Sequence, residues 1–320
     1  MNQNTNSSPT ILITGGTGFA GSHLVDALLE QGQTNVHVTS YGKNTGYVAE
    51  ILPESQLHSL DITDFEATKE LISQIQPDHI YHLAALAGVG SSFTKLKQVL
   101  DINTQIQLSV LIAMQEVRPQ ARLLSIGSAL EYQPQDRPLR ETDPLGPISP
   151  YGVSKVTQDM LAYAYYKQNN LQIIRTRSFN HIGERQAPGF VVADFAQQIV
   201  KIESGEQLDL QVGNLSAIRD FTDVKDMVKA YILLMNQGEI GEVYNIGSGQ
   251  GYTIAQILDI LVSQSKAEIS VIQDETKIRP TDISQVVADN SKIKQLGWTP
   301  VISIQETLAR TLNYYRTKKD

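Results

Sequence analysis

The chain has 320 residues and no cysteine, and its 34 acidic residues outnumber its 26 lysines and arginines to give a formal net charge of −8. Without cysteine it has no disulfide, no thiolate nucleophile and no cysteine-bound metal, and its acidic balance argues against nucleic-acid polymers, which need a basic face. His79 and His82, a closely spaced histidine pair, would face opposite sides of a strand, so no metal site is expected. The sequence shows neither a signal-peptide pattern nor an apolar run of membrane-spanning length, so we expect a cytoplasmic protein without membrane contacts.

The first half of the chain alternates short apolar segments with amphipathic ones, a pattern typical of a parallel sheet with helices on both faces. Strands are predicted at 10–14, 35–39, 56–60, 79–83, 122–126 and 171–176. Helices are predicted at 23–31, 65–75, 105–116 and 154–168, and residues 136–150 are predicted to form a loop. We therefore expect an α/β fold with a Rossmann-type doubly wound parallel sheet.

The pattern becomes less regular after residue 179. Helices are predicted at 190–203, 223–235, 253–263 and 304–316, and a strand is predicted at 243–246. We expect residues 9–178 to form the Rossmann domain, with segments around 219–247 returning to it. The segments 179–218 and 248–316 are expected to form a smaller mixed α/β lobe that binds the substrate.

Three glycines, Gly15, Gly18 and Gly21, lie between the first predicted strand and the first predicted helix. In a dinucleotide-binding loop the first glycine makes the sharp turn, the second lets the backbone approach a pyrophosphate, and the third lets the helix pack against the strand. The helix N-terminus then offers N–H groups to the phosphates. A tight turn without a ligand is the alternative, but the strand–loop–helix order favours a dinucleotide site.

The residues after the second predicted strand indicate which dinucleotide is bound. NAD-binding proteins usually place a carboxylate on the ribose about 20 residues beyond the loop, and no acidic residue occurs here between Glu30 and Glu50. Ser40 and Lys43 are suited to accept a 2′-phosphate instead. We therefore expect NADP(H), with NAD(H) as the alternative if Lys43 is an ordinary surface lysine.

Tyr151 and Lys155 are four residues apart, which places them on one face of a helix. The same spacing starts at Tyr163, Tyr314 and Tyr315, but only Tyr151 follows a proline-containing loop and a serine at a strand end, Ser128. A phenol has a pKa of about 10, and a nearby lysine lowers it. We expect Tyr151 to exchange a proton with a sugar or alcohol oxygen that Ser128 orients; a surface Tyr–Lys contact and a loop serine are the alternatives.

The glycine loop, Asp61-Ile62, the His-Leu-Ala-Ala segment at 82–85, Ser128 and the Tyr151/Lys155 pair together resemble the extended short-chain dehydrogenase/reductases. Members of this family act on nucleotide-sugars. The resemblance covers essentially the whole chain. Segments 177–183, 219–223, 244–249 and 279–282 look most like the branch of GDP-4-keto-6-deoxy-D-mannose reductases and GDP-mannose 4,6-dehydratases. The resemblance to these reductases implies NADPH-dependent reduction of the C4 keto group of GDP-4-keto-6-deoxy-D-mannose to GDP-D-rhamnose.

The resemblance also implies roles for individual residues. Ser128, Tyr151 and Lys155 would be catalytic, Asn103 would support Lys155 through water, and Asp61 would lie near the adenine. The residues assigned to the cofactor are Gly15, Thr17, Gly18, Phe19, Gly21, Ser40, Lys43, Asp61, Ile62, Leu83, Ala84, Ala85, Asn103, Tyr151 and Lys155. Those assigned to the GDP-sugar are Ser128, Asn180, Arg185, Val191, Arg219 and Arg279. Pairing of helix 154–168 with its twin would form a homodimer or a larger homo-oligomer.

One departure from the family pattern bears on the reaction. The 4,6-dehydratases carry a glutamate two residues before the tyrosine that closes the strand-end motif, and here Leu130 holds that position, followed by Glu131. Adjacent residues of an extended segment point to opposite sides, so we expect that Glu131 does not substitute. This disfavours a dehydratase and leaves a UDP-glucose 4-epimerase-like enzyme as the alternative. A non-catalytic dinucleotide sensor is the alternative of another class, although the intact Ser/Tyr/Lys set favours an enzyme.

Overall fold

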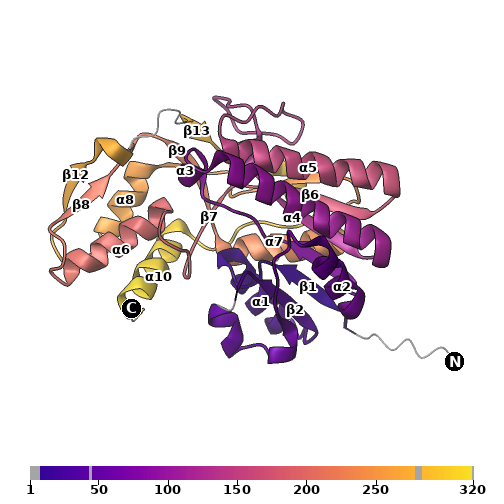
Figure 1. Ribbon diagram of the computed structural model, residues 1–320. Coiled ribbons are helices and arrows are strands. Elements are labelled where there is room, and N and C mark those ends of the chain that lie inside the picture. Colours follow the sequence, from indigo (N-terminus) through magenta and orange to yellow (C-terminus); the bar gives the residue numbers. More distant parts are fainter. Residues whose placement is uncertain (1–7, 43–44, 278–282, 319–320) are drawn as a thin grey trace.

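Seven parallel strands form the central sheet of the computed structural model, which describes residues 8–42, 45–277 and 283–318 (Figure 1). Their order across the sheet is β10-β6-β5-β4-β1-β2-β3. The strands are β1 (Ile11–Thr14), β2 (Val36–Ser40), β3 (Leu57–Ser59), β4 (His79–His82), β5 (Arg122–Ser128), β6 (Gln172–Ser178) and β10 (Val243–Ile246). The order reverses direction at β1, as in a doubly wound sheet, so the predicted Rossmann-type fold is confirmed.

Helices cover both faces of this sheet because its strands carry apolar side chains on both sides. In β1, Ile11 and Ile13 pack with α1 and α7, whereas Leu12 packs on the opposite face with α2, α4 and α5. In Figure 1, α4 and α5 lie side by side on one face, and α1 and α7 lie on the other. These helices are α1 (Phe19–Glu30), α2 (Phe65–Ile75), α4 (Leu96–Val117), α5 (Pro150–Asn169) and α7 (Val224–Gln237).

Three helices begin earlier than the sequence pattern predicts: α1 at residue 19, α4 at 96 and α5 at 150, instead of 23, 105 and 154. For α5 the reason is its N-terminal cap. The Ser149 side chain accepts a hydrogen bond from the Gly152 N–H, and Pro150 takes the first helical position, where no N–H is needed. Tyr151 therefore lies in the first turn of α5, held by the helix rather than by the preceding loop.

The rest of the chain forms a smaller lobe, seen at the left of Figure 1. Strand β9 pairs with β11, β13 and β7, and β8 pairs with β12; the sequence pattern predicted none of these short strands. Their bounds are β7 (Asn180–Ile182), β8 (Asp209–Val212), β9 (Ile218–Asp223), β11 (Gly251–Thr253), β12 (Ser270–Gln273) and β13 (Gln285–Val286). Its helices are α6 (Val191–Glu203), α8 (Ile254–Val262) and α10 (Ile304–Thr317), whereas α9 (Ser291–Gln295) packs beside β10 of the central sheet. The division of the chain into two domains stays a prediction.

Short helical segments complete the fold. They are η1 (Gly46–Glu50), η2 (Glu54–Gln56), α3 (Val89–Ser92), η3 (Ala129–Glu131) and η4 (Glu275–Lys277). The Asp64 side chain caps α2, and the Thr253 side chain caps α8. Within the three described ranges, none of the helices combines the length and the apolar character needed to cross a membrane.

Candidate active site

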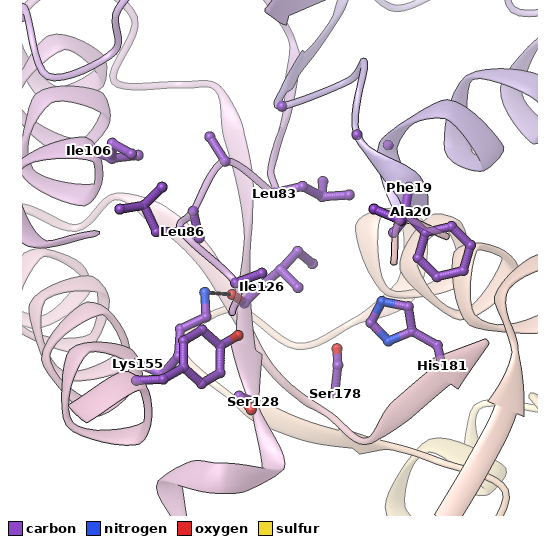
Figure 2. Close-up of a pocket in the computed structure, with 18 of the residues that line it drawn as sticks. Phe19, Ala20, Leu83, Leu86, Ile106, Ile126, Ser128, Lys155, Ser178 and His181 are labelled. Atoms are coloured by element: carbon purple, nitrogen blue, oxygen red, sulfur yellow. Dashed lines mark hydrogen bonds between the residues drawn. The ribbon is translucent and has the colours of Figure 1, made fainter. Parts of the chain in front are cut away.

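A cavity of about 710 Å³ lies at the carboxyl ends of the parallel strands, between the central sheet and the smaller lobe. This is where open α/β sheets bind their ligands, because strand order reverses there and opens a crevice. Its walls come from the loop after β1, the ends of β2, β4, β5 and β6, and the residues at the start of α6. Figure 2 shows the interior, with Phe19 and Ala20 on one side and Ser128 and Lys155 on another.

The glycine loop forms one wall of the cavity, and its geometry requires glycine. Gly15 has φ 69°, a left-handed conformation that glycine adopts without strain, and its carbonyl accepts a hydrogen bond from the Gly18 N–H. A Cβ on Gly21 would lie 2.4 Å from the Gly15 oxygen and 2.7 Å from the Gly16 Cα, so only glycine lets α1 pack this closely on the loop. No side chain caps α1, whose first residues line the cavity, so its N-terminus faces a potential anion site.

The far end of the cavity is bordered by the ends of β2 and β3. Ser40 lies there, and its hydroxyl donates to the Gly42 carbonyl at 3.0 Å. Asp61 also lines the cavity, and its carboxylate accepts from the Thr63 N–H and hydroxyl at 3.0 and 2.7 Å. Lys43, the other predicted 2′-phosphate ligand, lies outside the described residues. Five more residues assigned to the cofactor also line this cavity: Thr17, Ile62, Leu83, Ala84 and Ala85. Their contact with a cofactor stays a prediction.

Ser128, Tyr151 and Lys155 come together at the centre of the cavity. Ser128 ends β5, and α5 carries the other two residues one turn apart. The Lys155 Nζ donates to the Ile126 carbonyl at 2.7 Å, as Figure 2 shows, and to the Gln158 Oε1 at 2.8 Å. The structure thus brings together three residues that are separated by up to 27 positions in sequence, with a serine, a phenol and an ammonium group in one enclosure.

The ionisation of Tyr151 differs from the sequence-based expectation. Burial raises the pKa of its phenol, and the nearby charge of Glu131 raises it further, whereas interaction with the Ser128 hydroxyl lowers it. Burial lowers the pKa of Lys155, which the Glu131 charge partly offsets. The expected lowering of the tyrosine pKa by Lys155 is not seen, because burial dominates and the ammonium group is directed to Ile126 and Gln158. Tyr151 is therefore a protonated phenol at neutral pH.

Glu131 is fully buried beneath the site and does not line the cavity. One of its carboxylate oxygens accepts from the Ser128 N–H at 2.6 Å, and the other accepts from the Arg177 Nε at 3.2 Å. The prediction that Glu131 does not replace the dehydratase glutamate rested on an extended segment, and that premise is wrong because residues 129–131 form the 3-10 turn η3. Leu130 lines the cavity, so the wall is apolar at this position.

Asn103 is buried in α4, where its side-chain amide accepts from the Leu86 N–H at 2.8 Å and donates to the Ser154 hydroxyl at 2.9 Å. Its main-chain carbonyl accepts from the Gln158 Nε2 at 2.9 Å, and the Gln158 Oε1 accepts from the Lys155 Nζ. Asn103 is thus connected to the lysine through a side chain, and its predicted link through water stays a prediction.

The predicted substrate residues differ in their positions. Asn180 and Val191 line both the main cavity and an adjoining cavity of about 440 Å³, and Arg219 lines the adjoining one. The Arg219 Nη1 donates to the carbonyls of residues 218 and 283 at 2.8 Å. Arg279 lies outside the described residues.

The placement of Arg185 contradicts its predicted contact with a substrate phosphate. Its guanidinium pairs with Asp26 of α1 at 2.6 Å and lies 4.1 Å from the centre of the Tyr47 ring. Arg185 itself lines neither of the two cavities described above. The guanidinium instead contacts an acidic residue and an aromatic ring of the large lobe. Local sequence patterns could not indicate either contact.

Four further residues at the site were missed by sequence reasoning. Ser178 and Tyr231 line the cavity and share a hydrogen bond of 2.9 Å, and His181 stacks on Phe19 with ring centres 5.7 Å apart (Figure 2). Ser178 ends β6, so its place at a strand end was an available signal. Tyr231 and Gln158 lie in helices whose pattern indicates only packing, so nothing local distinguishes them.

The doubly wound sheet, the glycine loop and the Ser/Tyr/Lys cluster define a Rossmann-type oxidoreductase of the extended short-chain dehydrogenase/reductase class. A profile of the family described as GDP-mannose 4,6 dehydratase matches residues 12–311, and the chain belongs to this family. The class comprises enzymes that modify nucleotide-sugars, among them reductases, dehydratases and epimerases.

Three similar proteins illustrate this range. The GDP-6-deoxy-D-mannose reductase of Pseudomonas aeruginosa is 29% identical over 313 residues, which span 96% of this chain and 97% of that protein. The structure of RMD from Pseudomonas aeruginosa complexed with NADPH has a TM-score of 0.83 at 28% identity, covering 96% of this chain and 99% of the other. The UDP-glucose 4-epimerase of Thermus thermophilus, solved with NAD, has a TM-score of 0.85 at 27% identity, covering 96% and 99%.

Proposed function

We propose that this chain reduces the C4 keto group of GDP-4-keto-6-deoxy-D-mannose with NADPH and forms GDP-D-rhamnose. The observation that carries the proposal is the makeup of the cavity centre. Tyr151 is a protonated phenol beside Ser128 and Lys155, and Leu130 occupies the position where a dehydratase needs a carboxylate. Carbonyl reduction needs a proton donor and a bound hydride source, and no acid that eliminates water.

The glycine loop fits a dinucleotide, because Gly15 and Gly21 leave no room for a Cβ and the α1 N-terminus faces the cavity. Bound NADPH supplies the hydride. The Tyr151 phenol donates its proton to the oxygen that forms at C4, and the Ser128 hydroxyl holds this oxygen by a hydrogen bond. The raised pKa keeps the phenol protonated, and the alkoxide still takes its proton because an alkoxide is far more basic than a phenolate. The Lys155 ammonium stabilises charge at the same centre.

The cofactor preference rests on the end of β2. Ser40 and Lys43 replace the carboxylate that usually binds the NAD ribose, and the similar RMD protein was solved with NADPH. NAD(H) is the alternative, since the similar epimerase was solved with NAD. Asp61 would border the adenine, and the other cofactor-assigned residues among those the structure describes line the cavity, except Asn103.

On the substrate side, Asn180, the Val191 backbone, Arg219 and Arg279 are proposed to hold the diphosphate of GDP. Arginine suits this role because its planar group meets phosphate oxygens two at a time. The proposed homodimer would form through α5, where Val153 and Met160 leave 42% and 41% of their surface exposed. The proposed compartment is the cytoplasm.

A nucleotide-sugar 4-epimerase is the second candidate, because its chemistry also needs no acid at position 130 and an epimerase is among the similar structures. The two enzymes differ in cofactor use. A reductase consumes one NADPH for each product, whereas an epimerase takes a hydride from the sugar and returns it.

The variant Tyr151→Phe tests the proposal, because it removes only the proton donor. We expect the rate of NADPH oxidation with the keto sugar to fall at least about a thousandfold. NADPH affinity, measured by fluorescence titration, should change less than about threefold. Full activity in this variant would exclude the proposed role of Tyr151. Wild-type protein that binds NADPH but oxidises none with any keto sugar would favour a non-catalytic sensor.

A further inference from the structure

A chain of buried polar groups connects Lys155 with the neighbouring helix α4 and with a loop of the cavity wall. Lys155 and Gln158 are only 5% and 3% exposed, and both lie on α5. The Gln158 Oε1 accepts from the Lys155 Nζ at 2.8 Å, and the Gln158 Nε2 donates to the main-chain carbonyl of Asn103 in α4 at 2.9 Å. Gln158 thus connects the ammonium group to a neighbouring helix with both ends of its amide.

These contacts account for two of the three N–H groups of the lysine. One N–H is taken by the Ile126 carbonyl at 2.7 Å and one by the Gln158 Oε1. An ammonium group is tetrahedral and carries three donors. Since Lys155 lines the cavity, fixing two donors on the protein side directs the third toward the ligand space, where Tyr151 also lies.

The same chain reaches the cavity wall. The Asn103 side chain accepts from the Leu86 N–H at 2.8 Å, and Leu86 lines the cavity beyond β4. Asn103 also donates to the Ser154 hydroxyl, which in turn donates to the Tyr151 carbonyl at 2.7 Å. The position of the lysine is therefore tied, through Gln158 and Asn103, to the cavity wall at Leu86 and to the backbone of Tyr151.

We propose that Gln158 is a positioning residue for Lys155, holding the ammonium group so that one N–H is presented to the cofactor and the reacting oxygen. A neutral amide suits this role in a buried site. It accepts a hydrogen bond from the cation without neutralising it, so the positive charge stays available to the cavity. The titratable groups facing the ammonium from its surroundings are Glu131 of η3, His82 of β4 and, one turn away, Tyr151.

The test compares Gln158→Met, which keeps the length of the side chain without its amide, with Gln158→Glu, which keeps the acceptor and adds a charge. The matched control is Gln107→Met. Gln107 is a buried glutamine of α4 whose Oε1 accepts from the Ser125 hydroxyl. The first readout is the labelling of Lys155 by an amine-reactive reagent as a function of pH, followed by mass spectrometry on the protein without substrate.

Loss of the acceptor leaves a buried cation less stabilised, so the midpoint of labelling in Gln158→Met should move at least about one pH unit lower than in the wild type. In Gln158→Glu it should move higher by a similar amount, and in Gln107→Met it should not move. A midpoint unchanged in both Gln158 variants, with a melting temperature lowered as in Gln107→Met, would show that Gln158 only packs the core.

The second readout rests on the proposed function. The alkaline limb of the pH profile for NADPH oxidation should shift in the same directions as the labelling midpoints. If labelling shifts as expected but no variant or wild-type protein oxidises NADPH with the keto sugar, the positioning role stands and the proposed reaction fails. If the wild type is active and its labelling midpoint equals that of Gln158→Met, the positioning role is wrong and the proposed reaction stands.

Discussion

The two walls of the cavity are built in different ways. The wall proposed to bind the cofactor, called here the cofactor wall, consists of the glycine loop and strand ends of one sheet, and its shape depends on backbone positions such as Gly15 and Gly21. The wall proposed to bind the substrate, called here the substrate wall, is assembled largely from segments of the smaller lobe that are far apart in sequence. In the substrate wall the role of a side chain depends on the residues that it contacts. Arg185 forms an ion pair with Asp26, whereas Arg219 lines the adjoining cavity. A wall whose shape depends on the backbone can be predicted from a local sequence motif. A wall formed by side chains from distant segments cannot be predicted in this way.

The largest effect is expected on the cofactor wall, from Gly21→Ala. The added Cβ would meet backbone atoms at 2.4 and 2.7 Å, which cannot move without displacing the loop. We expect a loss of roughly 3 kcal/mol in unfolding free energy, measured by urea denaturation, together with at least tenfold weaker NADPH binding.

Gly18→Ala separates the two effects. Its Cβ would meet only the Gly15 oxygen, at 3.2 Å, within the protein. It should cost less than about 1 kcal/mol of stability, yet still weaken NADPH binding at least tenfold, because the methyl group would enter the cavity. Equal loss of stability in the two variants would contradict the distinction between fold and ligand roles within the loop.

A smaller effect is expected at His23, which links α1 to the segment after β7. Its Nε2 donates to the Glu184 carbonyl at 2.8 Å, and burial lowers its pKa to about 4. The unfolded chain therefore binds a proton on this histidine at a higher pH than the folded chain does. The contribution of the neutral His23 side chain to the unfolding free energy is fully present above pH 6.5 and is lost as the pH falls toward 4. At pH 5 the loss amounts to about 2 kcal/mol.

The variant His23→Gln retains an N–H donor but does not titrate. Between pH 6.5 and 5 the unfolding free energy of this variant should decrease by about 2 kcal/mol less than that of the wild type. Thermal or urea denaturation at the two pH values measures the difference. His82, whose pKa burial lowers to about 3, contributes a similar slope in both proteins and so cancels in the comparison. Parallel pH profiles for the two proteins would show that His23 is protonated in the folded state.

The smallest effect is expected from Arg185→Ala, which removes a partly buried ion pair and a ring contact. It should cost about 1 kcal/mol of stability and leave the KM for the GDP-sugar unchanged within twofold. The matched variant Arg219→Ala should raise that KM at least tenfold, because Arg219 lines the adjoining cavity. A large rise in KM for Arg185→Ala with none for Arg219→Ala would reverse the assignment of the substrate wall.

The sequence permitted most of the central sheet and its glycine loop to be predicted, because both follow from local periodicity and from glycine spacing. It underestimated α4 and α5 at their N-termini, and for α5 a cap at Ser149 and Pro150 decides the start rather than an apolar face. It also missed the short strands of the smaller lobe, which pair with partners far away in the chain: β7, β11 and β13 with β9, and β12 with β8.

The candidate site shows the same limit. Ser128, Tyr151 and Lys155 were predicted from strand-end and helix spacing, and the structure brings them together. The surroundings that set their chemistry were not predictable. Gln158 lies in what looks like ordinary helix packing, and the turn that buries Glu131 depends on its contact with Arg177, 46 residues away.

The central claim is net transfer of one hydride to C4, and isotope transfer tests it most directly. The protein is incubated with GDP-4-keto-6-deoxy-D-mannose and NADPH deuterated at the transferred position, and the sugar is analysed by NMR and mass spectrometry. The proposed reaction predicts one deuterium at C4 of GDP-D-rhamnose for each NADP⁺ formed. A product without deuterium, or an epimerised sugar formed with no net consumption of NADPH, would contradict it.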